Sequence, residues 1–176
     1  MYRTWIKFAL ISLTLIAVQV WVLSPWALFR LGTPYIYPFL LLLLPIGLRQ
    51  IPLVVFGFSI GFVLDLLYPT PGLHASVMTS TAFLRHYFVR SMVDREVDLE
   101  APALYRELRG GAVVLLIEIL VCHHLLLFFL DGGWASDLSY TLLRLGSSLM
   151  LSLALCLVML MLSNISLRPR SQYAKR

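Results

Sequence analysis

Long apolar runs, separated by short polar or proline-containing breaks, follow one another along nearly the whole of this 176-residue chain. A helix that spans the roughly 30 Å hydrocarbon core of a bilayer needs about 20 mainly apolar residues. The pattern therefore predicts an all-α integral membrane protein with six transmembrane helices in a single domain over residues 1–176. The predicted spans are Ile6–Phe29, Tyr35–Leu48, Ile51–Tyr68, Leu73–Val93, Ala112–Leu130 and Tyr140–Ser163.

The composition supports this membrane interpretation. Hydrophobic residues make up 60% of the chain, charged residues make up 13%, and the mean hydropathy is +0.86. A soluble domain of this size cannot bury so much apolar surface. The first run, Ile6 to Leu23, is longer than the apolar core of a signal peptide and is expected to remain as a signal anchor.

The basic residues predict the orientation. Under six spans, most of them fall on one side of the membrane, and both termini are then cytoplasmic by the positive-inside rule. The net charge of +5 fits this bias better than a nucleic-acid surface, because the basic residues do not form one patch. The cytoplasmic set is Arg3, Lys7, Arg49, Arg90, Arg95, Arg106, Arg109, Arg168, Arg170, Lys175 and Arg176.

Two segments depart from a regular helix pattern. Tyr35–Leu48 would make only about 21 Å of helix and contains Pro38 and Pro45. The span is therefore expected either to include the preceding residues as well or to be a broken or re-entrant segment. The connection at about 94–111 is densely charged. We interpret it as a solvated cytoplasmic loop with a short interfacial helix, with a specific docking surface as the alternative.

Small and polar residues mark one pair of spans. Gly57, Gly61 and Asp65 recur every four residues and therefore lie along one helical stripe, which allows close approach of another helix. We expect Asp65 to face the next span, at Ser76, Thr79 or Ser80, rather than lipid. The alternative is that it caps or locks the helix hairpin. The candidate helix-packing and partner-binding residues are Gly57, Gly61, Asp65, Gly72, Ser76, Thr79 and Ser80.

Other polar residues in the runs are assigned structural roles. His123 and His124 are expected to make interhelical hydrogen bonds, because their spacing from Glu118 is poor for a metal pair and no H-E-x-x-H motif occurs. Arg85 and His86 are expected to snorkel to the cytoplasmic boundary. Cys122 and Cys156 are interpreted as small hydrophobes. We expect no catalytic set, no metal and no cofactor.

The residues from Gly57 to Ala75 carry a family resemblance. The stretch Gly57-Phe58-Ser59-Ile60-Gly61-Phe62-Val63-Leu64-Asp65-Leu66-Leu67, followed by Pro71-Gly72-Leu73-His74-Ala75, resembles the rod shape-determining protein MreD family. Pro38-Phe39-Leu40-Leu41 resembles the proline-led second span of that family.

This resemblance implies a non-catalytic scaffold in the bacterial inner membrane. It would pair with MreC and, through that pair, connect to MreB, to the glycosyltransferase RodA and to the penicillin-binding protein of RodA in lateral peptidoglycan synthesis. The family is also similar in fold to the substrate-binding subunits of energy-coupling-factor vitamin transporters. Membrane lipid and a second copy of the chain are further candidate partners; nucleic acid is not.

Two other function classes remain open. A vitamin-type transport subunit would need a polar pocket near the outer face, for which Asp65, His74, Ser76 and the 131–137 loop are candidates. An intramembrane hydrolase would need Asp65 and Glu118 to approach each other, although their predicted depths lie on opposite sides of the bilayer centre.

Overall fold

The computed structural model describes residues 2–25, 32–93, 97–132, 135 and 137–166. Within this part of the chain every regular element is a helix, and no strand occurs. The long helices are α1 (Tyr2–Val18), α3 (Gln50–Leu67), α4 (Leu73–Met92), α6 (Gly110–Asp131) and α7 (Leu138–Ser166). The short ones are a π-helical turn η1 (Gln19–Leu23), a 3-10 turn η2 (Tyr37–Phe39), α2 (Leu40–Leu43) and α5 (Tyr105–Leu108).

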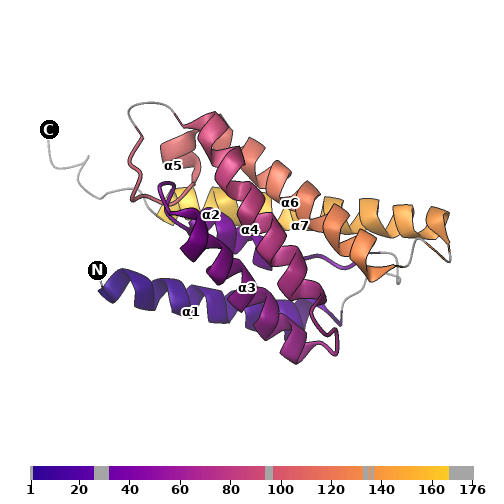
Figure 1. The fold of residues 1–176 in the computed structure, drawn as a ribbon. Helices are drawn as coiled ribbons and strands as arrows, with labels where there is room; N and C mark the ends of the chain where they lie inside the picture. The colour runs from indigo at the N-terminus through magenta and orange to yellow at the C-terminus, as the bar shows by residue number, and fades with distance from the viewer. Residues whose placement is uncertain (1, 26–31, 94–96, 133–134, 136, 167–176) are drawn as a thin grey trace, which may run out of the picture.

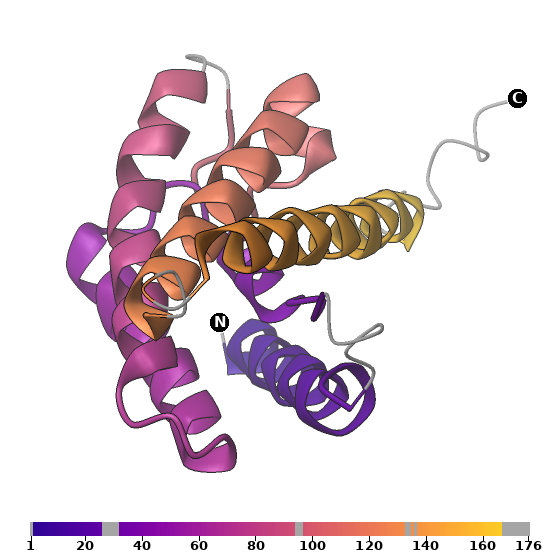
Figure 2. The ribbon, with the colours of Figure 1, turned by 90° about the vertical axis from the view of Figure 1, so that its right-hand side faces the viewer.

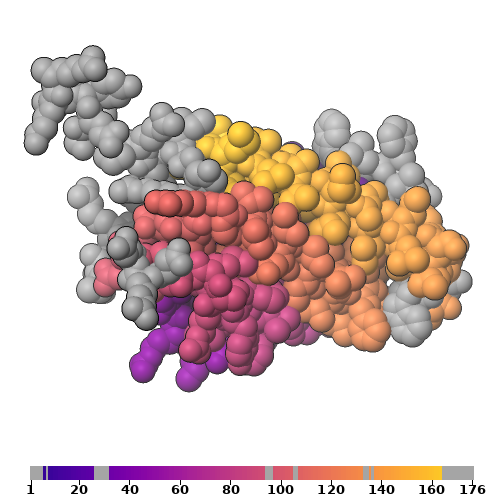
Figure 3. All heavy atoms as spheres, turned by 90° about the horizontal axis from the view of Figure 1, so that it is seen from above, coloured from indigo at the N-terminus to yellow at the C-terminus, as the bar shows by residue number. Residues whose placement is uncertain are grey.

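The helices run back and forth between two ends of the molecule (Figure 1). We call one the turn end, where residues 68–72 join α3 to α4 and residues 131–138 join α6 to α7. The opposite loop end contains the start of α1, the end of α7 and the connections at 44–49 and 97–109. Figure 2 shows the α3–α4 hairpin on one side and α1 and α7 on the other. Figure 3 shows α6 and α7 side by side across one broad face.

The predicted second span is not a continuous helix. Residues 33–36 have no regular secondary structure, and only η2 and α2 follow before the chain turns at 44–47. Pro34, Pro38 and Pro45 explain the breaks, since proline removes a backbone donor and disfavours helix at the preceding residue. The segment is nevertheless almost completely buried, with Tyr37, Leu40, Leu41 and Leu42 all at 0% exposure. Of the alternatives for this span, the structure therefore shows a broken segment, and the other helices enclose it.

The two glycines of the sequence stripe lie where α3 meets α4. A Cβ atom at Gly57 would come within 2.7 Å of both the Met78 carbonyl oxygen and the Ala82 Cβ. A Cβ atom at Gly61 would overlap the carbonyl of His74 and lie 2.5 Å from the Cα of Ala75. The absence of side chains therefore lets the two backbones touch, which makes α3 and α4 a closely packed hairpin.

Three helices in the described part of the chain are long and apolar enough to cross a membrane: Gln50–Leu67, Gly110–Asp131 and Leu138–Ser163. Phe8–Leu23 is apolar but shorter. The remaining long helix, α4, is the most polar of the five and packs between α3 and α6. Its position inside the bundle explains how it carries polar residues that a lipid-facing helix would not tolerate.

The glycine contact gives a direct test. We expect Gly61→Ala to destabilise the fold by about 1–3 kcal/mol, because the added methyl group must displace backbone atoms of α4. Gly146 in α7 is a matched control, since nothing lies within 4 Å of a Cβ placed there. Gly146→Ala should be neutral or more stable by up to about 1 kcal/mol. Equilibrium unfolding in mixed micelles measures both, and equal stability of Gly61→Ala and the wild type would contradict the packing argument.

Candidate functional site

Asp65 caps the start of α4 from the end of α3. One carboxylate oxygen accepts hydrogen bonds from the Thr70 hydroxyl at 3.0 Å and from the His74 backbone N–H at 2.9 Å. The other oxygen accepts from the Ala75 backbone N–H at 2.8 Å. Gly72 precedes the helix with a φ of 81° and has no side chain to cap it, so Asp65 provides the acceptor and the negative charge that a helix N-terminus favours.

The expected partners of Asp65 on α4 are wrong. The hydroxyls of Ser76 and Thr79 bond within their own helix, to carbonyl oxygens one turn earlier. Ser76 is exposed, whereas Thr79 and Ser80 are half-buried. The reason is geometric, because the side chain of Asp65 reaches the free N–H groups of the first turn before it reaches the later turns. The structure thus supports the alternative in which Asp65 locks the hairpin.

A buried hydroxyl joins three elements next to this cap. The Tyr37 hydroxyl lies 2.9 Å from His74 Nδ1 on α4 and 2.7 Å from His123 Nε2 on α6. A phenol can donate one hydrogen bond and accept another, so Tyr37 can satisfy both imidazoles at once. Tyr37 and His123 are both at 0% exposure, and His123 Nδ1 has no partner. Together, Asp65 and Tyr37 fix His74 by its backbone and by its ring.

His124 holds residues 33–36 from the other side. Its Nδ1 lies 2.7 Å from the Leu120 carbonyl oxygen, and its Nε2 lies 3.0 Å from the Ser152 hydroxyl on α7. A carbonyl only accepts, so the contact requires a proton on Nδ1. The Ser152 hydroxyl has one proton to donate, and both the Ser148 carbonyl oxygen at 2.7 Å and His124 Nε2 lie within reach of it. The Ser152 oxygen also accepts from the Tyr35 backbone N–H at 2.7 Å. The two histidines therefore make interhelical hydrogen bonds.

Two more polar side chains, which the sequence did not identify as important, bind this broken segment. Gln19 donates to the Pro34 carbonyl at 3.0 Å and accepts from the Ile36 N–H at 2.8 Å, and Ser148 accepts from the Thr33 N–H at 3.0 Å. The expected snorkelling of Arg85 is wrong: its exposure is 1%, and it donates to the Leu44 carbonyl at 2.8 Å. Its guanidinium compensates for the free carbonyls at the end of α2, which no helical turn follows.

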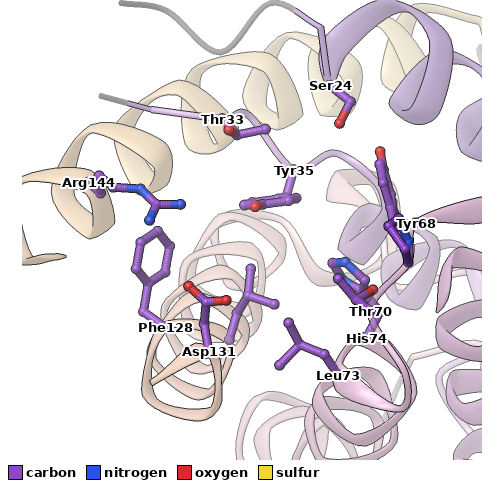
Figure 4. A pocket seen from close by; sticks show the side chains of 12 residues that line it. Ser24, Thr33, Tyr35, Tyr68, Thr70, Leu73, His74, Phe128, Asp131 and Arg144 are labelled. Carbon is purple, nitrogen blue, oxygen red and sulfur yellow. The ribbon is translucent and has the colours of Figure 1, made fainter. Parts of the chain in front are cut away.

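A pocket of about 220 Å³ opens at the turn end, beside the Tyr37 network (Figure 4). Tyr35, Tyr68 and Phe128 provide aromatic walls, and His74, Asp131 and Arg144 are its ionisable residues. We call these six residues the turn-end pocket. The Arg144 guanidinium lies 5.4 Å from the centre of the Phe128 ring, a cation–π contact. Of the residues predicted for an outer pocket, His74 and Asp131 line it, whereas Asp65 and Ser76 do not.

The remaining candidates do not assemble into a reactive site within the described residues. Asp65 lies at the turn end, and Glu118 lies in the loop-end half of α6 with one carboxylate oxygen buried and unpartnered. Cys122 and Cys156 are free thiols. No group of three His, Cys, Asp or Glu side chains that could hold a metal ion occurs among the described residues. The arrangement is typical of structural polar groups in an apolar domain.

Comparison of the chain with protein families, with curated proteins and with solved structures finds no match.

The cap predicts a specific cost for removing the Asp65 charge. All three groups at the carboxylate are donors, so the amide of Asp65→Asn must turn an NH2 group toward a buried donor. We expect a loss of about 1–3 kcal/mol in the free energy of unfolding, and a larger loss for Asp65→Leu.

Asp137→Asn is the matched control for that experiment. Asp137 accepts from the Tyr140 N–H at 2.9 Å at an exposed position near the start of α7, where Asn caps about as well as Asp. Its unfolding free energy should stay within about 0.5 kcal/mol of the wild type. If Asp65→Asn were equally harmless, the acceptor role of both carboxylate oxygens would be contradicted.

The Tyr37 hydroxyl is a second target. Tyr37→Phe removes the shared partner of His74 and His123 and leaves buried ring nitrogens unsatisfied, which should cost about 1–3 kcal/mol. Tyr87→Phe, at a residue with 52% exposure on α4, should change little. Thermal unfolding of the two variants side by side measures the difference, and equal midpoints would argue against the hydrogen-bonded network.

Proposed function

We propose that this chain is a non-catalytic scaffold of the bacterial inner membrane, with six crossings and cytoplasmic termini. In this proposal it pairs with MreC and helps to organise the rod-shape machinery of MreB, RodA and its penicillin-binding protein. The fold would resemble that of energy-coupling-factor substrate-binding subunits. The resemblance of residues 57–75 to the MreD family motivates the proposal, and the path of the chain between its two ends supports it.

The use of the buried polar groups is the observation that carries this proposal. Asp65 caps α4, Arg85 binds the carbonyls after α2, and Gln19 binds the irregular residues before η2. Tyr37 joins two histidines rather than presenting a nucleophile to a cleft. Side chains that could do chemistry are therefore occupied in holding elements together, which favours a structural role over a catalytic one.

The glycine stripe cannot be the partner surface in this arrangement, because α4 covers it. A better candidate is the opposite face of α3, where apolar side chains at helical spacing are exposed and Phe58 and Phe62 stack with ring centres 5.8 Å apart. A transmembrane helix of the partner could pack along it, as aromatic anchors are common at interfaces. This α3 outer face consists of Ile51, Val55, Phe58, Phe62 and Leu66.

The turn-end pocket favours a second candidate function, a substrate-binding membrane subunit of a vitamin-type transporter. Its aromatic walls and its two opposite charges suit a small amphipathic molecule better than a metal or a bare ion. An apolar cavity of about 150 Å³ is enough to bind benzene, so 220 Å³ can hold a ligand of at least that size.

Affinity purification from native membranes, followed by mass spectrometry, tests the proposal. We expect recovery of MreC with RodA or its penicillin-binding partner, and a loss of about tenfold or more in Phe58→Ala/Phe62→Ala, since buried aromatic anchors carry much of a binding energy. Phe83→Ala, at an exposed position on α4, is the control and should retain the partners. Recovery of paired ATPases with a coupling membrane subunit would contradict the scaffold and support the transporter.

A further inference from the structure

A second pocket lies at the loop end, on the other side of the molecule from the turn-end pocket. Its volume is about 410 Å³. One wall is the last part of α4, where His86, Val89 and Arg90 fall on a single helical face, together with Val93 directly after the helix. The facing wall is the connection before α3, including Arg49, together with Leu99. We call it the loop-end pocket.

The walls of this pocket are tied together by backbone hydrogen bonds. The Ile46 N–H donates to the Ala101 carbonyl at 2.9 Å, and the Gly47 N–H donates to the Leu99 carbonyl at 2.8 Å. Gly47 permits this contact, because a Cβ there would lie 2.8 Å from the Leu99 Cβ. The pocket is thus preformed between two fixed connections and a helix, as ligand pockets usually are.

Its charge is positive. Arg49 and Arg90 are exposed, His86 is half-buried, and none of the described residues that line the pocket carries a carboxylate. Neither arginine forms an ion pair within the part of the chain that the structure describes. Acidic residues adjoin the lining in sequence at two places: Asp94 follows Val93 and lies outside the described residues, and Asp98 and Glu100 flank Leu99. Asp98 accepts a hydrogen bond from the Glu100 N–H within its own loop at 3.0 Å. Two arginines beside apolar lining residues match a ligand that combines an anion with a hydrocarbon part.

The position of the pocket identifies the source of such a ligand. It lies where α3 begins and α4 ends, which is the boundary between the apolar helices and the loops. In a membrane this is the depth of lipid headgroups, and basic pockets between helices on the cytoplasmic side bind anionic headgroups. Val89 and Val93 would then contact the glycerol and the first acyl carbons.

We infer that the loop-end pocket binds the phosphodiester headgroup of an anionic phospholipid, with Arg49 and Arg90 as its phosphate ligands. The inference rests on the chain being a membrane protein and is independent of the scaffold proposal. The shared chemistry is a phosphate group, which a lipid or free phosphate can supply. The test must therefore separate these two sources.

The experiment is native mass spectrometry of the purified full-length chain, titrated separately with phosphatidylglycerol, phosphatidylcholine and inorganic phosphate. We expect one tightly bound phosphatidylglycerol and at least about fivefold weaker binding in each of Arg49→Gln and Arg90→Gln, from the usual contribution of a basic residue near anionic lipid. Arg109→Gln is the matched control, because it removes the same charge at the same end but outside the pocket.

Each of the following results would contradict the inference. Phosphatidylcholine has the same phosphodiester, but its choline group offsets the charge, so equal binding would show that the pocket does not select an anionic headgroup. An equal loss in Arg109→Gln would show diffuse attraction to the surface. Saturation by inorganic phosphate with no gain from the lipid would assign the pocket to free phosphate. The lipid-free variants should unfold at the same temperature as the wild type. A lower unfolding midpoint, large enough to explain the weaker lipid binding by loss of folded protein, would show that the arginines are structural.

Discussion

The buried backbone of residues 33–47 is the constraint on which the rest of the structure depends. This segment runs through the apolar centre of the molecule without forming a continuous helix, so its N–H and C=O groups lack the partners that a helix would supply. In a bilayer no water can replace those partners, and each unsatisfied group would cost several kcal/mol. The surrounding elements supply them instead. Gln19, Ser148 and Ser152 bind residues 33–36, which have no regular structure, and Arg85 binds the carbonyls after α2. The broken segment therefore determines which polar residues the neighbouring helices must carry.

The cap on α4 and the interior network are physically connected. Asp65 binds the backbone N–H of His74, the ring of His74 meets the Tyr37 hydroxyl, and that hydroxyl meets His123 on α6. The close α3–α4 contact at Gly61 sets the position of His74 relative to α3, and therefore the place where its ring meets the Tyr37 hydroxyl. Networks of this kind are worth more when every member has a partner. A substitution at the turn end should therefore also disturb the hydrogen bonds of Tyr37 at the centre. This coupling explains why one tight hairpin can order a domain of otherwise apolar helices.

The sequence was informative wherever a local period carried the signal. Apolar runs predicted α3, α4, α6 and α7 close to their observed bounds, and the four-residue spacing identified the helix face on which Gly57, Gly61 and Asp65 lie. It was uninformative where contacts join distant positions, such as Thr33 with Ser148 or Arg85 with Leu44. No period marks those pairs, because the break in the second segment creates the need for them. The prolines indicated that a break was possible, but they could not say which side chains would compensate for it. The family resemblance and the partners stay predictions.

The two pockets differ in charge. At the turn end, Arg144 and Asp131 share one pocket, so opposite charges line it. At the loop end, Arg49 and Arg90 have no carboxylate beside them among the described lining residues. The positive-inside rule predicts that the loop end is cytoplasmic, and the anionic lipids of that leaflet would then be attracted to the positively charged pocket. A partner helix that packs on the α3 outer face would lie beside this pocket, because Ile51 follows Arg49 by only two residues. A bound lipid would therefore border the partner interface, and the lipid composition of the leaflet becomes a physical variable in how firmly such a partner is held.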